Sequence, residues 1–364
     1  MSLRAMETPL QSLHNGTWFK LICGASSQHI PTIRSCAVAY AIAGADCIDL
    51  AADPAIVMAV KESIAAIQPN FPTVNPWLMV SLNDGEDPHF RKAEFDPETC
   101  PKDCDRPCEK VCPTDAIKFS PSFSGVVDAL CYGCGRCLPI CPIHTIQARP
   151  YVYAPEVIVP MVLELGIDAI EIHTQIGRTQ DFARLWQTIK PNIHQLKLLA
   201  VSCPDGPGMA DYLQDLSQIL SPPNDPLPCA LIWQTDGRPM SGDIGDGATR
   251  ACIRLGQTVL ALDLPGFVQL AGGTNNHTVP KLTQLGLFPP KGDRYLAGIA
   301  YGSYARSQIQ PVLQQLEALG INRLEEYPDL LEESVKIASK LTAALKRDRS
   351  PQNLTGLFSG PFSK

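Results

Sequence analysis

The sequence lacks the features that mark three broad classes of protein. No apolar run in the 364 residues approaches the length of about 18 residues that a membrane-spanning helix needs. The N-terminal stretch MSLRAMETPLQSLHNG has no apolar core of the kind found in a secretion signal. The net charge is −7 and the longest basic run covers only 346–349, so nucleic acid is not expected as a partner. We therefore expect a cytoplasmic protein that does not span a membrane, in a compartment where disulfides are uncommon.

Several catalytic motifs are also missing. The sequence has no Gly-x-Ser-x-Gly elbow between a strand and a helix, no phosphate-binding Walker loop and no His-Glu-x-x-His pair. No catalytic residue is therefore assigned. The absence of these motifs disfavours the enzyme classes that they define.

What the sequence does contain is an alternation of strand and helix patterns. Such alternation is typical of βαβ units and a parallel sheet. The two short segments 259–262 and 268–270 can be one strand or two, so eight or nine strands are expected. A (β/α)₈ barrel of the triosephosphate isomerase (TIM) type fits this count, and an open doubly wound sheet is the alternative. The strand patterns cover 18–24, 47–51, 77–82, 169–173, 197–201, 230–233, 259–262, 268–270 and 298–301, and the helix patterns cover 30–44, 54–67, 156–165, 179–189, 210–220 and 246–255.

The alternation stops between Asn83 and Pro155, where eight of the fourteen cysteines lie. This stretch contains an internal repeat, because CEKVCPTDAI from Cys108 matches CLPICPIHTI from Cys137 at an offset of 29 residues. Two copies of one small unit indicate a module with pseudo-two-fold symmetry. We expect a barrel formed by 1–83 and 151–345, a two-cluster ferredoxin-like insert at 84–150, and a flexible tail at 346–364.

The second cysteine run, Cys131-x2-Cys134-x2-Cys137-x3-Cys141, has the spacing found in bacterial ferredoxins. In those proteins three cysteines of such a run bind one [4Fe–4S] cluster and the fourth binds the other. Gly133 and Gly135 permit the positive φ angles that a tight ligand loop needs. The first run, Cys100-x3-Cys104-x3-Cys108-x3-Cys112, has two gaps that are each one residue longer. Either a [4Fe–4S] or a [3Fe–4S] cluster is therefore expected at this run. The crossed rule assigns Cys112, Cys131, Cys134 and Cys137 to one iron–sulfur cluster, and Cys100, Cys104, Cys108 and Cys141 to the other.

Other readings of the cysteines are weaker. Structural zinc sites commonly separate two cysteine pairs by about 15–20 residues, whereas here four thiols fall within one short run. The three-cysteine motif of enzymes that use S-adenosylmethionine needs gaps of three and then two residues, whereas Cys100, Cys104 and Cys108 are separated by three and three. The remaining cysteines are expected to be buried free thiols, with Cys203 the best candidate for an exception. These six are Cys23, Cys36, Cys47, Cys203, Cys229 and Cys252.

Polar residues follow several of the expected strands, where barrel enzymes place their active sites. Glycine-rich turns after the last two strands are a frequent phosphate site, so a phosphate or flavin ligand is a second hypothesis. Tight turns that need glycine explain the same pattern. The strand-end candidates are Asp53, Asn83, His173, Cys203, Asp236, Arg238, Asn275 and His277, and the candidate cradle consists of Gly272, Gly273, Gly302, Ser303 and Arg306.

The sequence resembles the cyanobacterial light-dependent period (LdpA) family over nearly its whole length. The resemblance implies an iron–sulfur protein on the input side of the circadian clock, which reports cellular redox state and contacts the clock protein KaiA and the input histidine kinase CikA. A quinone or another redox pool is the expected electron partner. The chain is thus expected to be a redox sensor or electron-transfer protein rather than an enzyme that turns over a substrate. An oxidoreductase that passes electrons from the clusters to a flavin or phosphate-bearing substrate in the barrel is the alternative. The stretches that carry the resemblance are WFKLICGASS (18–27), AGADCIDLAADPA (43–55), the two cysteine runs, IWQTDGRPMSGDIGDGATR (232–250) and QLAGGTNNHT (269–278).

Overall fold

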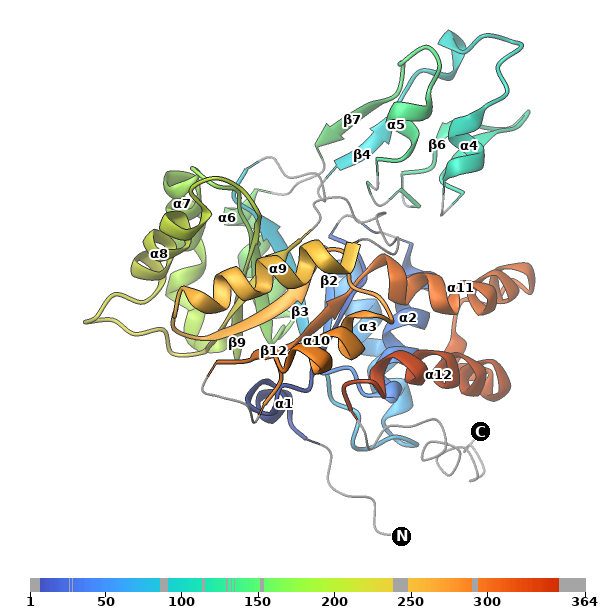
Figure 1. The fold of residues 1–364 in the computed structure, drawn as a ribbon. Coiled ribbons are helices and arrows are strands. Elements are labelled where there is room, and N and C mark those ends of the chain that lie inside the picture. The colour runs from blue at the N-terminus through green and yellow to red at the C-terminus, as the bar shows by residue number, and fades with distance from the viewer. Residues whose placement is uncertain are drawn as a thin grey trace.

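Eight parallel strands close into a barrel in the computed structural model of the chain (Figure 1). The structure describes residues 7–25, 27, 29–85, 91–112, 115–128, 130, 131, 133, 135–150, 154–237, 248–289 and 294–346. The barrel strands are β1 (Trp18–Ile22), β2 (Cys47–Ala51), β3 (Trp77–Asn83), β8 (Ala169–His173), β9 (Leu198–Pro204), β10 (Ala230–Asp236), β11 (Phe267–Ala271) and β12 (Leu296–Tyr301). They pair in the order β1-β12-β11-β10-β9-β8-β3-β2, and β2 pairs with β1 to close the ring. The prediction of a (β/α)₈ barrel is confirmed, and the open sheet is wrong.

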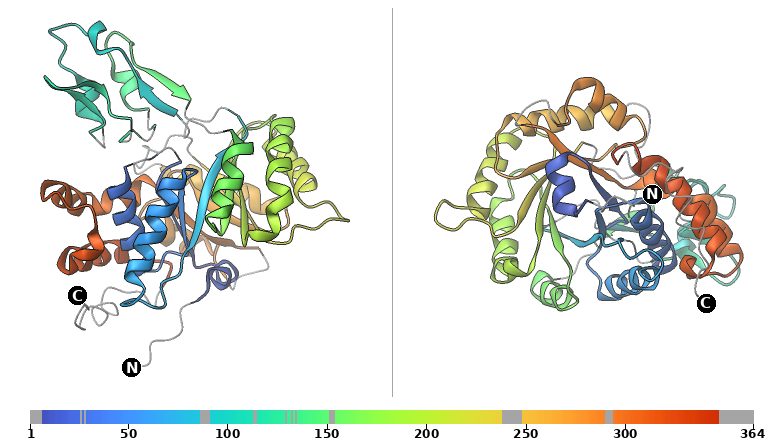
Figure 2. Two further views of the ribbon diagram at one scale, coloured as in Figure 1. Left: turned by 180° about the vertical axis from the view of Figure 1, so that it is seen from behind. Right: turned by 90° about the horizontal axis from the view of Figure 1, so that it is seen from below.

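Helices surround the barrel, as the view along its axis shows (Figure 2). Local sequence sets their ends: Asp53 caps the first turn of α3 with its side chain, and Gly44 ends α2 with a φ of 106°. The helices outside the cysteine-rich segment are α1 (Pro9–Asn15), α2 (Ile30–Ala43), α3 (Pro54–Ile67), α6 (Pro155–Glu164), α7 (Thr179–Ile189), α8 (Met209–Leu220), α9 (Ala248–Ala261), α10 (Thr278–Leu285), α11 (Ser303–Ala318) and α12 (Pro328–Thr342), with short 3₁₀ turns at η3 (Lys190–Gln195) and η4 (Leu324–Glu326).

One part of the sequence prediction is wrong. Residues 259–262 were expected to form a strand, but α9 continues through Ala261. The expected helix 246–255 was taken to end at Gly256, yet this glycine lies inside α9, while its expected cap Asp246 lies outside the described residues. A Cβ on Gly256 would come within 2.3 Å of Leu270 Cδ2. Gly256 therefore lets α9 pack closely on β11 and does not end the helix.

The apolar core has two parts. One lies between the strands and the surrounding helices, and the other fills the N-terminal half of the barrel interior. Helix α1 covers that end, where Leu13 packs with Trp18 and Trp77. Within the described residues, the longest apolar helices are too short to reach from one side of a lipid bilayer to the other.

The cysteine-rich segment is inserted between β3 and α6, beyond the C-terminal ends of the barrel strands (Figures 1 and 2). It forms two small antiparallel sheets, in which β4 pairs with β7 and β5 pairs with β6. Its elements are β4 (Arg91–Glu94), η2 (Pro97–Thr99), α4 (Pro107–Val111), β5 (Ile117–Phe119), β6 (Ser124–Val126), α5 (Cys137–Ile140) and β7 (Gln147–Pro150).

Candidate iron–sulfur centre

The backbone of the insert repeats the 29-residue offset of its sequence. Helix α4 corresponds to α5, and Asp115 and His144 take the same left-handed conformation with φ of 50° and 52°. Arg106 and Gly135 form a second matched pair, with φ of 51° and 72°. Gly133 also has a φ of 72°, so the positive φ predicted for both glycines of the ligand loop is confirmed. Non-glycine residues rarely adopt such angles, so the fold of the repeat imposes them.

The thiols gather in a small apolar core between the two sheets. Cys108, Cys131, Cys137 and Cys141 are buried there, packed with residues such as Ile117 and Ile146. Cys100, Cys104 and Cys112 are partly exposed, and Cys134 lies outside the described residues. Water is therefore largely excluded from the side of the thiols that faces the core.

The first run and the last cysteine of the second run lie close together. Burial, together with the neighbouring thiols of Cys104 and Cys141, raises the pKa of Cys100. Burial and the same Cys141 thiol, with Cys100, raise the pKa of Cys108, although backbone amides oppose the shift. Cys141 therefore lies among the thiols of the other run, and not only beside its own sequence neighbours.

Backbone amides point at the thiols. The Ala93 N–H donates to Cys131 Sγ at 3.3 Å, and the Ala116 N–H donates to Cys112 Sγ at 3.2 Å. Burial opposes ionisation of Cys141, but the backbone N–H groups of residues 143–146 outweigh it and lower the pKa of the thiol. Amide donors favour the thiolate, which is the form that binds metal.

This donor set fits iron–sulfur clusters. Buried thiols with N–H donors supply soft anionic ligands in a dry environment, and hydrogen bonds to the sulfurs tune the potential of such clusters. Among the described residues, no three His, Cys, Asp or Glu side chains converge closely enough to hold a single metal ion. Each iron of a cubane takes its own thiolate, so the thiols of a cluster site stand further apart than those of a mononuclear site.

Charged side chains surround the thiols unevenly. The loop charges Lys102, Asp103 and Asp105 are exposed, and the Arg106 guanidinium lies 4.3 Å from the centroid of the Phe119 ring. Lys92 on β4 is completely buried, and its Nζ donates to the Asp128 carbonyl oxygen at 2.6 Å. Burial lowers the pKa of Lys92, and Asp128 and Cys131 only partly offset this effect.

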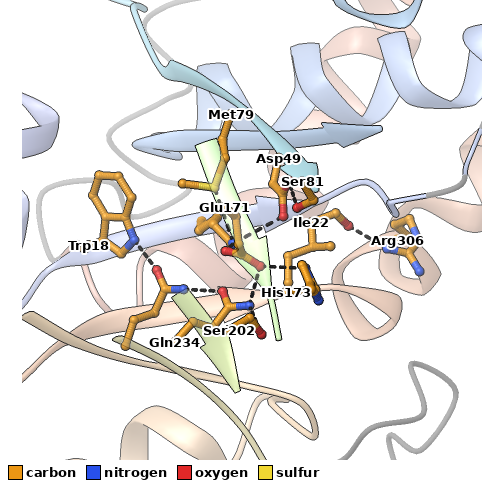
Figure 3. Close-up of polar contacts among 12 residues, drawn as sticks. Trp18, Ile22, Asp49, Met79, Ser81, Glu171, His173, Ser202, Gln234 and Arg306 are labelled. Atoms are coloured by element: carbon orange, nitrogen blue, oxygen red, sulfur yellow. Dashed lines mark hydrogen bonds and ion pairs between the residues drawn. The ribbon is translucent and has the colours of Figure 1, made fainter. Parts of the chain in front are cut away.

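The barrel interior contains a second buried polar group, which the sequence analysis did not identify (Figure 3). Lys20 is completely buried, forms an ion pair with Glu171, and lies 3.2 Å from Asp49 Oδ2. Burial alone would lower the pKa of Lys20, but the two carboxylates outweigh it and raise the pKa. Burial raises the pKa of Asp49, and Lys20 only partly offsets this effect.

Hydrogen bonds extend this network across the barrel. His173 Nε2 lies 2.9 Å from Glu171 Oε1, to which Gln234 Nε2 donates at 2.7 Å. Gln269 Nε2 donates to Gln234 Oε1 at 2.5 Å, and Trp18 Nε1 donates to Gln269 (Figure 3). Burial opposes ionisation of Glu171, but Lys20 and His173 hold its pKa at about 2. A barrel interior of this kind is more often filled by branched apolar residues.

A pattern in the sequence could have revealed this network. Five strands each contribute a charged or amide side chain to the barrel interior, as in WFKLI around Lys20 and AIEIH around Glu171. Alternation with period two places such residues on one face of the strand. The signal was missed because the surrounding residues are apolar on both faces. Lys92 has no comparable signal, since a lysine in a short strand is ordinarily exposed.

Several strand-end candidates have structural partners. Asp53 accepts a hydrogen bond from the Ala55 N–H as the cap of α3, and Asn83 Nδ2 donates to the Gly85 carbonyl. Asn275 Oδ1 accepts from Thr249 Oγ1 at 3.0 Å and from the backbone N–H of His277 at 2.9 Å.

The other candidates differ in exposure. His173 and Asp236 are buried, His277 is exposed, and Arg238 lies outside the described residues.

The candidate cradle lies where the last two strands end. Gly272 and Gly273 have φ of 61° and 98°, and Gly302 precedes the first residue of α11, Ser303. Arg306 Nη1 donates to the Ile22 carbonyl at 2.5 Å and its Nη2 donates to Ser303 Oγ at 3.2 Å. These bonds join β1 to the start of α11, so the arginine has a structural role, and ligand binding by the cradle stays a prediction.

The six cysteines outside the insert are free thiols in this structure. Burial raises the pKa of Cys36 to about 12 and that of Cys229 to about 11. Burial, followed by Asp84, Asp236 and Asp205, raises the pKa of Cys203 to about 12. The Cys203 thiol is therefore protonated at neutral pH and is a poor nucleophile.

Two family models match separate parts of the chain. Residues 100–152 match the model described as the LdpA Fe-S cluster-binding domain, and residues 161–344 match that of the light dependent period A C-terminal domain. Light dependent period A of Synechococcus elongatus is 51% identical over 339 residues, which cover 93% of this chain and 94% of that protein. The chain belongs to the LdpA family. The iron–sulfur cofactor predicted from the cysteine spacing is thereby confirmed for this LdpA family member.

Solved structures with a similar fold are more distant. The tryptophan synthase alpha subunit of Legionella pneumophila is 11% identical, with a TM-score of 0.41, and the match covers 94% of this chain and 100% of that one. A tryptophan synthase structure from M. tuberculosis is 10% identical, with a TM-score of 0.38, and covers 92% and 100%.

Proposed function

We propose that this LdpA family member is a cytoplasmic redox sensor of the circadian clock that carries two iron–sulfur clusters. Cys112, Cys131, Cys134 and Cys137 hold one cluster, and Cys100, Cys104, Cys108 and Cys141 hold the other. Such clusters accept and release single electrons, here in exchange with a quinone or another redox pool. The change in charge alters a surface that contacts clock proteins, of which KaiA and the histidine kinase CikA are the proposed partners.

The position of Cys141 is the observation that carries the two-cluster assignment. Its thiol lies within electrostatic range of Cys100 and Cys108, although 33 residues separate it from Cys108 in the sequence. A fourth ligand supplied from the other run is the arrangement of two-cluster ferredoxins. The matched backbone conformations of the two halves support the same assignment, because equivalent ligand loops are expected to bind equivalent clusters.

The clock role is supported by family membership. The relative in S. elongatus is named for a light-dependent period, and it matches this chain over nearly the whole length of both proteins. Light changes the redox state of a photosynthetic cell, so a cluster that exchanges electrons with a cellular pool supplies the connection between light and period.

Anaerobic purification with iron and sulfide analysis tests the cofactor assignment. We expect about eight iron atoms per chain for two [4Fe–4S] clusters, or about seven if one is [3Fe–4S]. Iron-free protein, or protein that contains zinc instead, would contradict the assignment.

Ligand variants test the crossing. We expect Cys141→Ser to alter the same electron paramagnetic resonance signal as Cys104→Ser, and Cys112→Ser to alter the same signal as Cys134→Ser. If Cys141→Ser and Cys134→Ser instead affect one common signal, the clusters are not crossed.

Binding of KaiA and CikA, measured with oxidised and reduced protein, tests the sensor. The dependence of binding on oxidation state should disappear in Cys134→Ser.

A second candidate function is an oxidoreductase in which the clusters exchange electrons with a flavin in the barrel. The buried ions Lys20, Glu171 and Asp49 are the observation that favours it, because ionisable groups with shifted pKa values are frequent at functional sites. Flavin absorbance of the purified protein tests it, and Gly302→Ala should weaken that absorbance. A Cβ on Gly302 would meet no atom closer than 3.7 Å, so this variant should fold. Absence of flavin from the native protein would eliminate this candidate.

A further inference from the structure

The buried lysine of the insert lies beside one of the two proposed clusters. The Asp128 carbonyl oxygen accepts two hydrogen bonds, from Lys92 Nζ at 2.6 Å and from the Cys131 N–H at 3.2 Å. The ammonium nitrogen and the Cys131 amide nitrogen are therefore within about 6 Å of each other. The next residue in β4, Ala93, donates its N–H to Cys131 Sγ. The Lys92 ammonium thus lies near the backbone of Cys131, while the N–H of its neighbour contacts the Cys131 thiol itself.

The negative charge around Lys92 is shared with another cation. Arg149 stands opposite Lys92 in the β4–β7 pair and forms an ion pair with the Asp128 carboxylate. Lys92 Nζ lies 3.9 Å from that carboxylate, and the Cys131 thiol and Asp53 of the barrel also act on its charge. Asp128 is therefore shared between two cations, and Arg149 also faces the Glu94 carboxylate at 3.8 Å, so the buried ammonium of Lys92 does not have Asp128 to itself.

Among the described residues of the other half of the insert, no lysine or arginine is buried. Phe119 pairs with Ser124, and Ala148, 29 residues after Phe119, pairs with Ala93. The pseudo-two-fold therefore makes Ser124 the equivalent of Ala93, and places Phe123 at the position of Lys92. Phe123 is 44% exposed, whereas Lys92 is completely buried. The two proposed clusters consequently differ by one desolvated cation.

We propose that Lys92 raises the reduction potential of the cluster held by Cys112, Cys131, Cys134 and Cys137, so that this cluster is reduced before the one held by Cys100, Cys104, Cys108 and Cys141. A cation stabilises the additional negative charge of a reduced cluster, and burial protects the interaction from screening by water and salt. The inference rests on the proposed function, because it requires two clusters. Lys92 places a positive charge beside the cluster and does not bind iron.

A redox titration followed by electron paramagnetic resonance tests the inference, with three variants of the full chain. Lys92→Gln removes the charge and keeps a hydrogen-bond donor, Lys92→Arg keeps the charge, and Lys118→Gln removes an exposed lysine of the same insert. At a fixed potential, we expect Lys92→Gln to raise the ratio of oxidised to reduced cluster about tenfold in one of two transitions, which corresponds to about 59 mV for a one-electron couple. The transition that moves should be the one altered by Cys134→Ser, Lys92→Arg should restore it, and Lys118→Gln should leave both unchanged.

The outcomes separate the two proposals. Native protein without two reducible clusters would defeat the proposed function. Two clusters whose transitions are both unmoved by Lys92→Gln, or are moved equally by it or by Lys118→Gln, would overturn the role of Lys92 alone. If Lys92→Gln does not retain its clusters, Asp128→Asn decides, because removal of the shared carboxylate should raise the potential of the same cluster. An unchanged or lowered potential in that variant would overturn the inference.

Discussion

The barrel and the insert each bury one lysine completely, but the two lysines are stabilised in different ways. Lys20 in the barrel faces two buried carboxylates, which raise its pKa. Lys92 in the insert has a carbonyl oxygen at 2.6 Å and a carboxylate only at 3.9 Å, and burial lowers its pKa. In the barrel the positive charge is more than matched by negative charge, so it acts within the scaffold. In the insert Asp128 and Cys131 only partly offset the effect of burial, and the charge lies beside a proposed cluster ligand.

This contrast shows that complete burial of a charge does not define its role. A buried ion pair is costly to break, because removal of one partner leaves the other charge in a poorly solvated place. A buried charge with a weak partner has a longer reach, because little of its field is cancelled nearby. The partners, and not the burial, therefore distinguish a residue that holds the fold together from one that tunes a cofactor.

The largest expected effect lies in the barrel. Lys20→Met removes the ammonium and leaves Glu171 and Asp49 buried together without a cation. We expect the free energy of unfolding to fall by about 3–5 kcal/mol. Urea unfolding followed by tryptophan fluorescence measures this, because Trp18 and Trp233 are both buried in the barrel.

The matched control for this change is Lys340→Met. Lys340 is exposed on α12, and its replacement should alter the free energy of unfolding by no more than about 0.5 kcal/mol. Equal effects of the two variants would mean that the buried ions contribute nothing special to the barrel.

The pH dependence of stability should show the same ion pair. The pKa of Glu171 is held at about 2 in the folded state, against an ordinary value of 4.5. Its ionised form therefore stabilises the fold above pH 4.5, and this contribution is lost as the pH falls from 4.5 towards 2. We expect a loss of about 3 kcal/mol that is absent from Glu171→Gln, measured by urea unfolding at several pH values.

Asp49 supplies a control of opposite sign. Its pKa is raised in the folded state, so protonation of Asp49 favours the fold as the pH falls. Asp49→Asn should therefore make the acid loss of stability steeper, whereas Glu171→Gln should make it shallower. Variants that respond alike would contradict the separate assignments of the two carboxylates.

The smallest expected effect lies in the insert. Arg106 has a φ of 51°, while its repeat equivalent is Gly135. Arg106→Gly relieves a strain of about 1 kcal/mol but loses a cation–π contact with Phe119 worth about 0.5–1 kcal/mol. We expect the free energy of unfolding to change by less than about 0.5 kcal/mol. Gly135→Ala, which adds the strain without a new contact, should be the more destabilising variant.

The sequence was sufficient for the barrel and for the internal repeat of the insert. Period-two apolar strands, the Asp53 cap and the Gly44 terminus all act locally, so they can be recognised without knowledge of the fold. The glycines of the ligand loop were predicted for the same reason. The end of α9 was not, because Gly256 is explained by contact with Leu270, a residue on a different element.

The electrostatic arrangement could not be predicted in the same way. Lys20, Glu171 and Asp49 come from three strands, and Glu171 lies 151 positions after Lys20 in the sequence. Lys92 is buried because β4 pairs with β7, which lies more than fifty residues later in the sequence. Such roles depend on pairs of distant segments, and composition or spacing does not specify these pairs.

The pairing of β4 with β7 also has a consequence for how the cysteine-rich module is attached. Arg91 and Pro150 are register partners, so the chain enters and leaves the module through adjacent residues of one antiparallel pair. Neighbouring strands lie only about 5 Å apart, a gap that a tight turn spans. The two ends of the module therefore lie side by side, as in a hairpin. Such a module can be inserted into a single surface loop of a barrel, or of another scaffold, without separating the two ends of that loop.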